Sequence, residues 1–216
     1  MENKGVVISP DRMRSIFSGL TKYRNEGFIT SPGFIRVEQA ISNGKAVYAF
    51  PVTKDQNSDT VTERKLDRND KFMVTHMGLF LMKRLSTKTG IEVLQTYPNI
   101  LEFADVSSTF LGADLETFYN GNIGIKVGQT VYIEAMDTRK FRSVEDVQQS
   151  AATNKSSARE NSGFIELTPQ ILLDGDQKND ISLTAPVHSS ALVAHTTAST
   201  TNYLVWMARG FLITRK

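Results

Sequence analysis

The side chains that could carry chemistry in this chain are few and widely spaced. Its three histidines, His76, His188 and His195, are scattered along the sequence, and there is no cysteine. His188 and His195 are separated by an expected loop, which does not place both rings on one face of a strand. We therefore expect ordinary polar histidines rather than metal ligands. The lack of cysteine excludes disulfides, thiolate metal sites and cysteine nucleophiles.

The acidic run Asp174–Asp180, with the sequence DGDQKND, superficially resembles a calcium-binding loop. An EF-hand loop has Asp or Asn at its fifth position and glycine at its sixth, where this chain has Lys178 and Asn179, and no glutamate closes the loop. A hairpin turn rich in Asp and Asn is the better interpretation. A structural Ca²⁺ or Mg²⁺ that bridges subunits is the alternative.

Other kinds of enzyme chemistry lack a recognisable arrangement. The sequence contains no phosphate-binding, dinucleotide-binding, serine-hydrolase or zinc-protease motif. Glycoside hydrolysis needs two carboxylates facing a cleft, and nothing pairs any two of Glu92, Glu102, Glu116 and Glu134. The single tryptophan, Trp206, lies in an apolar segment and is expected to anchor the core. We expect neither an enzyme nor a bound cofactor or metal.

One amphipathic helix is expected, at Ser9–Arg24, where Ser9 can cap the helix and Pro10 fits its first turn. Four apolar side chains recur at i, i+3, i+4 and i+7 on one face: Met13, Ile16, Phe17 and Leu20. This stripe must pack either on the domain's own sheet or on a neighbouring subunit. We predict it as an assembly interface, on an N-terminal helical arm of residues 1–33 with a hinge at Gly27 and residues 31–33.

From Phe34 onward the apolar pattern takes the period of two that is typical of strands. About eight to ten short strands and one short helix at Gly112–Tyr119 predict a mainly β fold over residues 34–216. We expect an antiparallel β-sandwich, with jelly-roll connectivity. The stretch 145–162 is rich in Ser, Ala, Asn and Gln and is expected to be an exposed, mobile loop. The expected core consists of Phe72, Val74, Leu79, Leu81, Ile125, Val131, Ile133, Leu172, Leu183, Leu204 and Trp206.

The net charge of the 216 residues is +2, and the basic residues form only short clusters. At most a weak contact with a packaged nucleic acid is therefore expected. No apolar run approaches the ~20 residues of a membrane helix, and the first residues contain no apolar signal region. These patterns predict a protein without a membrane-spanning segment that is made in the cytoplasm of a cell.

Several segments, taken in order, resemble virion structural proteins of bacteriophages that infect Bacteroidota. They are Tyr97-Pro98, the segment LETFYNG at 115–121 leading into IGIKVGQTVYI, the pair Asp137-Thr138 with Phe141, and LTPQILLDGDQKNDISL before a terminal apolar strand. The resemblance spans residues 69–216 and consists of the order and texture of these segments.

This resemblance implies a jelly-roll or related β-sandwich that serves as a capsid or capsid-associated protein. Such a protein is located in the virion and assembles with copies of itself and with other virion proteins. A receptor- or glycan-binding β-sandwich module of a virion fibre or an adhesin is the alternative that the sequence leaves open.

Overall fold

The computed structural model describes residues 10–42, 44–55, 62–85, 93–98, 103, 112–144, 147–150, 153–156, 163–186 and 200–215. The helices are the α-helix α1 (Pro10–Asn25) and the 3-10 helices η1 (Gly112–Tyr119) and η2 (Thr138–Phe141). The strands are β1 (Phe28–Ala40), β2 (Val47–Ala49), β3 (Lys71–Leu85), β4 (Asn122–Val127), β5 (Thr130–Asp137), β6 (Val147–Ser150), β7 (Thr153–Ser156), β8 (Phe164–Asp174), β9 (Asn179–Thr184) and β10 (Thr200–Arg215).

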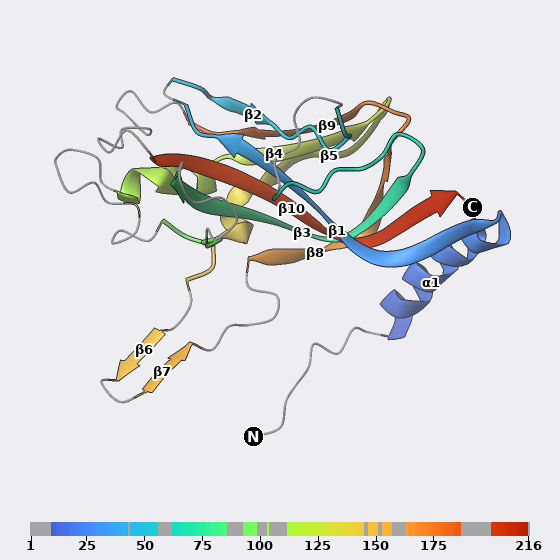
Figure 1. The fold of residues 1–216 in the computed structure, drawn as a ribbon, viewed down its shortest axis with the longest axis horizontal. Helices are drawn as coiled ribbons and strands as arrows, with labels where there is room; N and C mark the ends of the chain where they lie inside the picture. Colours follow the sequence, from blue (N-terminus) through green and yellow to red (C-terminus); the bar gives the residue numbers. More distant parts are fainter. Residues whose placement is uncertain are drawn as a thin grey trace.

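Two four-stranded sheets form the body of the protein (Figure 1). Sheet A has the strand order β1-β10-β3-β8, sheet B has the order β2-β9-β4-β5, and all neighbouring strands are antiparallel. Four of the pairings are nested along the chain, because β1 pairs with β10, β2 with β9, β3 with β8 and β4 with β5. The expected antiparallel sandwich with an N-terminal helix and a short mid-chain helix is confirmed.

The core lies between the two sheets, where side chains of sheet A such as Phe72 and Trp206 join one cluster with Ile123 and Leu183 of sheet B. The alternation of apolar and polar residues places every second side chain in this layer. Most of the expected core residues are buried there: Phe72, Val74, Leu79, Leu81, Ile125, Leu183, Leu204 and Trp206.

Three expected core residues need correction. Val131 is 56% exposed, because it lies on β5, the edge strand of sheet B. Ile133 of the same strand is only partly buried. Leu172 is also partly buried, since it alternates with Ile171 and Leu173 and therefore faces away from the layer between the sheets.

The segment after α1 is a strand where the sequence suggested a hinge. The helix ends in a turn at Gly27, whose φ of 86° lies in the left-handed region that favours glycine. β1 then begins at Phe28, and residues 31–33 pair with residues 210–212 of β10. Pro32 is tolerated because β1 is an edge strand of sheet A. The flexible connection expected at residues 31–33 is therefore a paired part of the sheet.

Two other expected features fall in connections between strands. Part of the stretch 145–162 forms β6 and β7, which pair with each other in a separate two-stranded sheet (Figure 1). The acidic run between β8 and β9 forms the predicted turn, in which Asn179 Nδ2 donates a hydrogen bond to the carbonyl oxygen of Asp174 at 2.8 Å. His188 and His195 lie outside the described residues.

Candidate functional site

The helix α1 packs on the face of sheet A that points away from sheet B. Ile16 and Leu20 are 7% and 1% exposed and form a small cluster with Met73 and Ile213. Met73 and Ile213 follow directly after Phe72 and Leu212, which face the core between the sheets. Because successive side chains of a strand point to opposite faces, the helix must lie on the outer side of the sheet. Figure 1 shows α1 beside the ends of β1 and β10.

A buried arginine fixes this helix to the sheet. Arg12 forms an ion pair with Glu166 of β8, and its Nη2 donates to the carbonyl oxygen of Thr75 at 3.0 Å. Thr75 is skipped in the register of β3 with both neighbouring strands, which run from Val74 directly to His76. A bulged residue leaves backbone groups without hydrogen-bond partners in the neighbouring strands. The Arg12 side chain provides such a partner for the carbonyl oxygen of Thr75. Arg12 precedes Ile16 by one helical turn, a spacing that could have identified it as part of the buried row.

The predicted interface residues are therefore divided between two environments. Ile16 and Leu20 belong to the protein's own fold, whereas Met13 and Phe17 are 44% and 54% exposed. Arg14 lies beside Phe17, three positions away on the helix, and its side chain is 83% exposed. The three neighbouring side chains Met13, Arg14 and Phe17 form what we call the α1 outer face.

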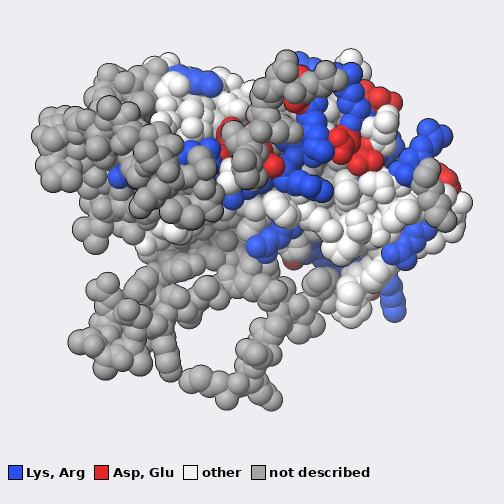
Figure 2. All heavy atoms as spheres, viewed as in Figure 1, with Lys and Arg blue, Asp and Glu red and all other residues white. Residues whose placement is uncertain are grey.

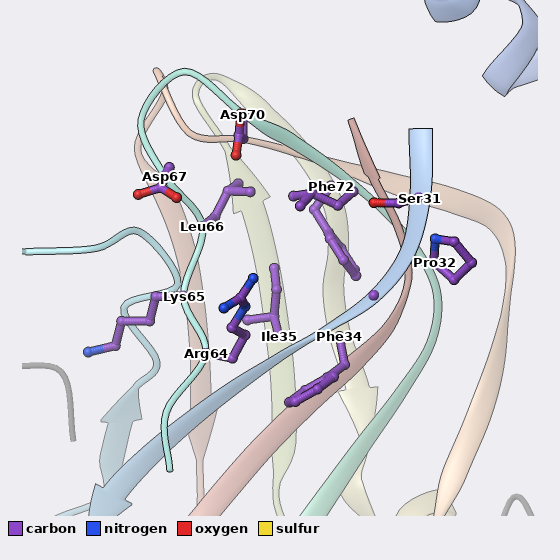
Figure 3. Close-up of a pocket in the computed structure, with 12 residues that line it drawn as sticks. Ser31, Pro32, Phe34, Ile35, Arg64, Lys65, Leu66, Asp67, Asp70 and Phe72 are labelled. Atoms are coloured by element: carbon purple, nitrogen blue, oxygen red, sulfur yellow. The ribbon is translucent and has the colours of Figure 1, made fainter. Parts of the chain in front are cut away.

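A pocket lies at the β1 edge of sheet A (Figure 3). It has a volume of about 340 Å³. Its apolar wall comes from Ile35, Leu66, Phe72 and Leu212. Asp67 and Asp70 stand at one end of it, and the basic residues Arg64 and Lys65 also line it. The segment 64–66 closes one side, because Arg64 exchanges two backbone hydrogen bonds of 2.9 Å with Arg36 of β1.

Gly33 keeps the pocket open, and Asp70 places a carboxylate at its end. Neither the backbone nor the packing requires glycine at position 33. Gly33 has no positive φ, and a Cβ there would lie at ordinary contact distances of 3.6 Å from Phe72 and 3.8 Å from Leu212. The lack of a side chain at Gly33 leaves the pocket open. The Asp70 carboxylate has no hydrogen-bond or ion-pair partner among the described residues, whereas Asp67 contacts Lys54 at 2.9 Å. Burial, and then the negative charge of Asp67, raise the pKa of Asp70 above its ordinary value. A cation brought to this carboxylate would be stabilised.

A buried ion network lies on the outer face of sheet A, and sequence reasoning did not find it. Its centre is Glu38, whose side chain is 2% exposed. One carboxylate oxygen accepts from Arg36 Nε at 2.9 Å and from Thr62 Oγ1 at 2.7 Å, and the other accepts from Arg84 Nη2 at 2.7 Å. The carboxylate is fully engaged by these donors, so its evident role is to hold β1, β3 and the residue at 62 together.

His76 is the one histidine within the described residues. Burial, followed by the positive charges of Arg12 and Arg209, lowers its pKa below the ordinary value. Glu166 stands opposite His76 in the β3–β8 register but is engaged by Arg12. Thr75 Oγ1 lies 3.0 Å from His76 Nδ1, so the neutral ring has a hydrogen-bond partner.

We expect the stability of the protein to fall as pH drops below about 6.5, the pKa of histidine in an unfolded chain. The folded state binds fewer protons at His76 than the unfolded state does, so this contribution is complete above that pH and is lost below it. Thermal melts between pH 7.5 and about 5.5 should show a smaller decline for His76→Asn than for the unmodified chain. Equal declines for the two proteins would contradict the assignment.

Charge on the face shown in Figure 2 is mixed. Figure 2 shows basic and acidic side chains interspersed over the face in view, within the part of the chain that the structure describes. Nucleic-acid binders commonly gather Lys and Arg into a patch or stripe. This face therefore gives no added support to a nucleic-acid contact.

Among the described residues, no group of three or more His, Asp or Glu side chains is placed to hold a metal ion. None of the helices described here has the length and apolar character to span a bilayer. No family model, curated protein or solved structure matches the chain, so its function has to be inferred from its fold and its surfaces.

Proposed function

We propose that this chain is a structural virion protein that assembles with copies of itself into a capsid or a capsid-associated oligomer, and that its sandwich is a jelly roll. The proposal agrees with the resemblance to virion proteins of phages that infect Bacteroidota. The α1 outer face is proposed as one of the surfaces through which copies meet.

The nesting of strands is the observation that supports this proposal most. Counted among the eight strands of the two sheets, the first pairs with the eighth, the second with the seventh, the third with the sixth and the fourth with the fifth. This is the pairing of one long hairpin of strands that has been rolled over into two sheets. Eight-stranded jelly rolls recur in viral capsid proteins and in lectins.

The surface of α1 adds a second line of support. Met13 and Phe17 expose large apolar side chains beside each other, although the same helix buries Ile16 and Leu20. Neighbouring exposed apolar residues are a common mark of a protein interface. Because the helix is already held by Arg12 and by the Ile16–Leu20 cluster, a second protein can pack on its outer face without displacing it.

The double variant Met13→Ser/Phe17→Ser should fold and melt like the unmodified chain but assemble less. Both side chains are about half exposed, so little core packing is lost. Sedimentation velocity and negative-stain electron microscopy measure the assembly. The matched control is Val131→Ser/Val144→Ser, which removes two equally exposed apolar side chains elsewhere, at 56% and 53% exposure.

Two results would contradict the proposal. Assembly of the α1 variant to the same extent as the unmodified chain would exclude the α1 outer face as an interface. A fixed trimer that binds a glycan or a receptor and forms nothing larger would favour a fibre module instead.

A further inference from the structure

We infer that the pocket at the β1 edge is the socket for the α1 outer face of a second copy of this chain, with Phe17 seated on its apolar wall and Arg14 next to Asp70. This inference rests on the proposed self-assembly and deepens it by naming the partner surface. The partner copy supplies an aromatic ring for the apolar wall and a cation for the Asp70 end of the pocket, away from the basic residues Arg64 and Lys65 that also line it.

Size is the first argument. The pocket holds about 340 Å³. A cavity of roughly 150 Å³ lined by aliphatic and aromatic side chains is enough to bind benzene, so one phenylalanine ring fits with room for a neighbouring methionine. The wall that such a ring would meet is apolar, from Ile35, Phe72 and Leu212. Gly33 keeps that wall accessible, although a side chain at this position would meet no close contact.

Charge is the second argument. Asp70 is partly buried at the end of the pocket, and in the described part of the chain its carboxylate has no hydrogen bond or ion pair, although the positive charge of Lys54 acts on it. The α1 outer face places the exposed Arg14 one helical turn from Phe17, so an apolar group and a cation are presented together. Arg14 and Asp11 form an ion pair at 3.6 Å, but both side chains are more than four-fifths exposed, so the pair adds little stability. Arg14 can therefore leave Asp11 and contact Asp70 of a second copy.

The position of the two surfaces requires a second copy. Ile16 and Leu20 hold α1 on the outer side of sheet A, whereas Gly33, Phe72 and Leu212 line the pocket on the side that faces the core. Phe17 therefore does not enter the pocket of its own chain. The α1 outer face (the knob) and the pocket (the socket) are different patches of the chain, so the contact between two copies is heterologous. Repeated contacts of this kind build rings or open arrays rather than a closed pair.

Complementation between two defective variants tests this geometry. The knob variant is Met13→Ser/Phe17→Ser. The socket variant is Gly33→Val, which fills the pocket at a strand position where a Cβ has ordinary contacts. Each variant alone should lose this contact and assemble less than the unmodified chain. An equimolar mixture should form additional dimers, because each such dimer joins the one intact knob to the one intact socket.

A charge exchange tests the named pair independently. Arg14→Glu and Asp70→Lys should each weaken assembly by about tenfold or more, since each places like charges together. The double variant Arg14→Glu/Asp70→Lys should recover assembly to near that of the unmodified chain. Thermal melts of all variants establish that each is folded before its assembly is compared.

The outcomes separate this inference from the proposed function. If the unmodified chain is a monomer, both fail. If it assembles and Gly33→Val assembles equally well, the socket is wrong and the proposed function stands. A mixture of the knob and socket variants that forms no additional dimers also overturns the inference, because the α1 outer face then meets some other surface.

Discussion

Replacing Trp206 with alanine is expected to lower the free energy of unfolding by about 3–5 kcal/mol. The side chain is fully buried on β10, the strand that lies between β1 and β3 in sheet A, with Val37 and Leu79 directly opposite on those strands. Its removal leaves a large cavity that a paired central strand cannot collapse to fill. Chemical denaturation followed by circular dichroism measures the loss.

Two controls make this result specific. Val131→Ala, at a position that is 56% exposed, should change the stability by no more than about 0.5 kcal/mol. Trp206→Phe should lose less than the alanine variant, because the indole Nε1 has no hydrogen-bond partner among the described residues and its removal leaves no acceptor there unpaired. An unchanged denaturation midpoint for Trp206→Ala would mean that the core between the sheets is not where we place it.

Replacing Glu38 with alanine is expected to lower stability by about 3–5 kcal/mol, an effect as large as that of the core tryptophan. The carboxylate is 2% exposed and accepts hydrogen bonds from Arg36 and Arg84, whose side chains are only 16% and 11% exposed. Its removal takes away the carboxylate that both of these poorly solvated guanidinium groups contact. The same denaturation measurement detects this.

Glu38→Gln and Lys178→Ala are the matched controls. The glutamine keeps the shape and part of the hydrogen bonding, so its cost should fall between those of the unmodified and alanine proteins. Lys178 pairs with Asp180 at 3.8 Å and is 85% exposed, so its loss should cost at most about 1 kcal/mol. A Glu38→Ala cost as small as that of Lys178→Ala would show that the network is solvated and contributes little to the fold.

Local patterns in the sequence predicted the elements well. The apolar stripe and the cap placed the N-terminal helix within one residue of α1, and the short helix at Gly112–Tyr119 has the bounds of η1. Period-two alternation identified Phe72 and Trp206 as core residues, because strand geometry alone determines which side chains share a face.

Features that depend on which strands become neighbours were not predictable. Val131 has the alternation of a core residue, but its exposure follows from the edge position of β5, which no local pattern reveals. Proline and glycine at residues 31–33 suggested a hinge. They lie instead in a paired edge strand, which no local pattern could indicate because the pairing depends on the distant strand β10. The pairing of β1 with β10 joins segments that are far apart in the sequence.

The candidate site was predicted only in part for the same reason. The stripe on α1 was visible in the sequence, but which of its side chains remain exposed is decided by the docking of the helix on Met73 and Ile213. The sequence analysis singled out neither Arg12 nor Glu38, because the partners that surround these charged side chains are brought to them only by the tertiary fold. The pocket joins β1 to the segment 64–70, which are separate in sequence.

The mass of the unmodified chain in solution tests the central claim most directly. Sedimentation velocity over a wide range of protein concentration, at physiological ionic strength, should show species many times heavier than the 24.1 kDa chain, with their share rising as the concentration rises. A protein that assembles through heterologous contacts must behave in this way. A single species with the mass of one chain at every concentration would contradict self-assembly as the function of this protein.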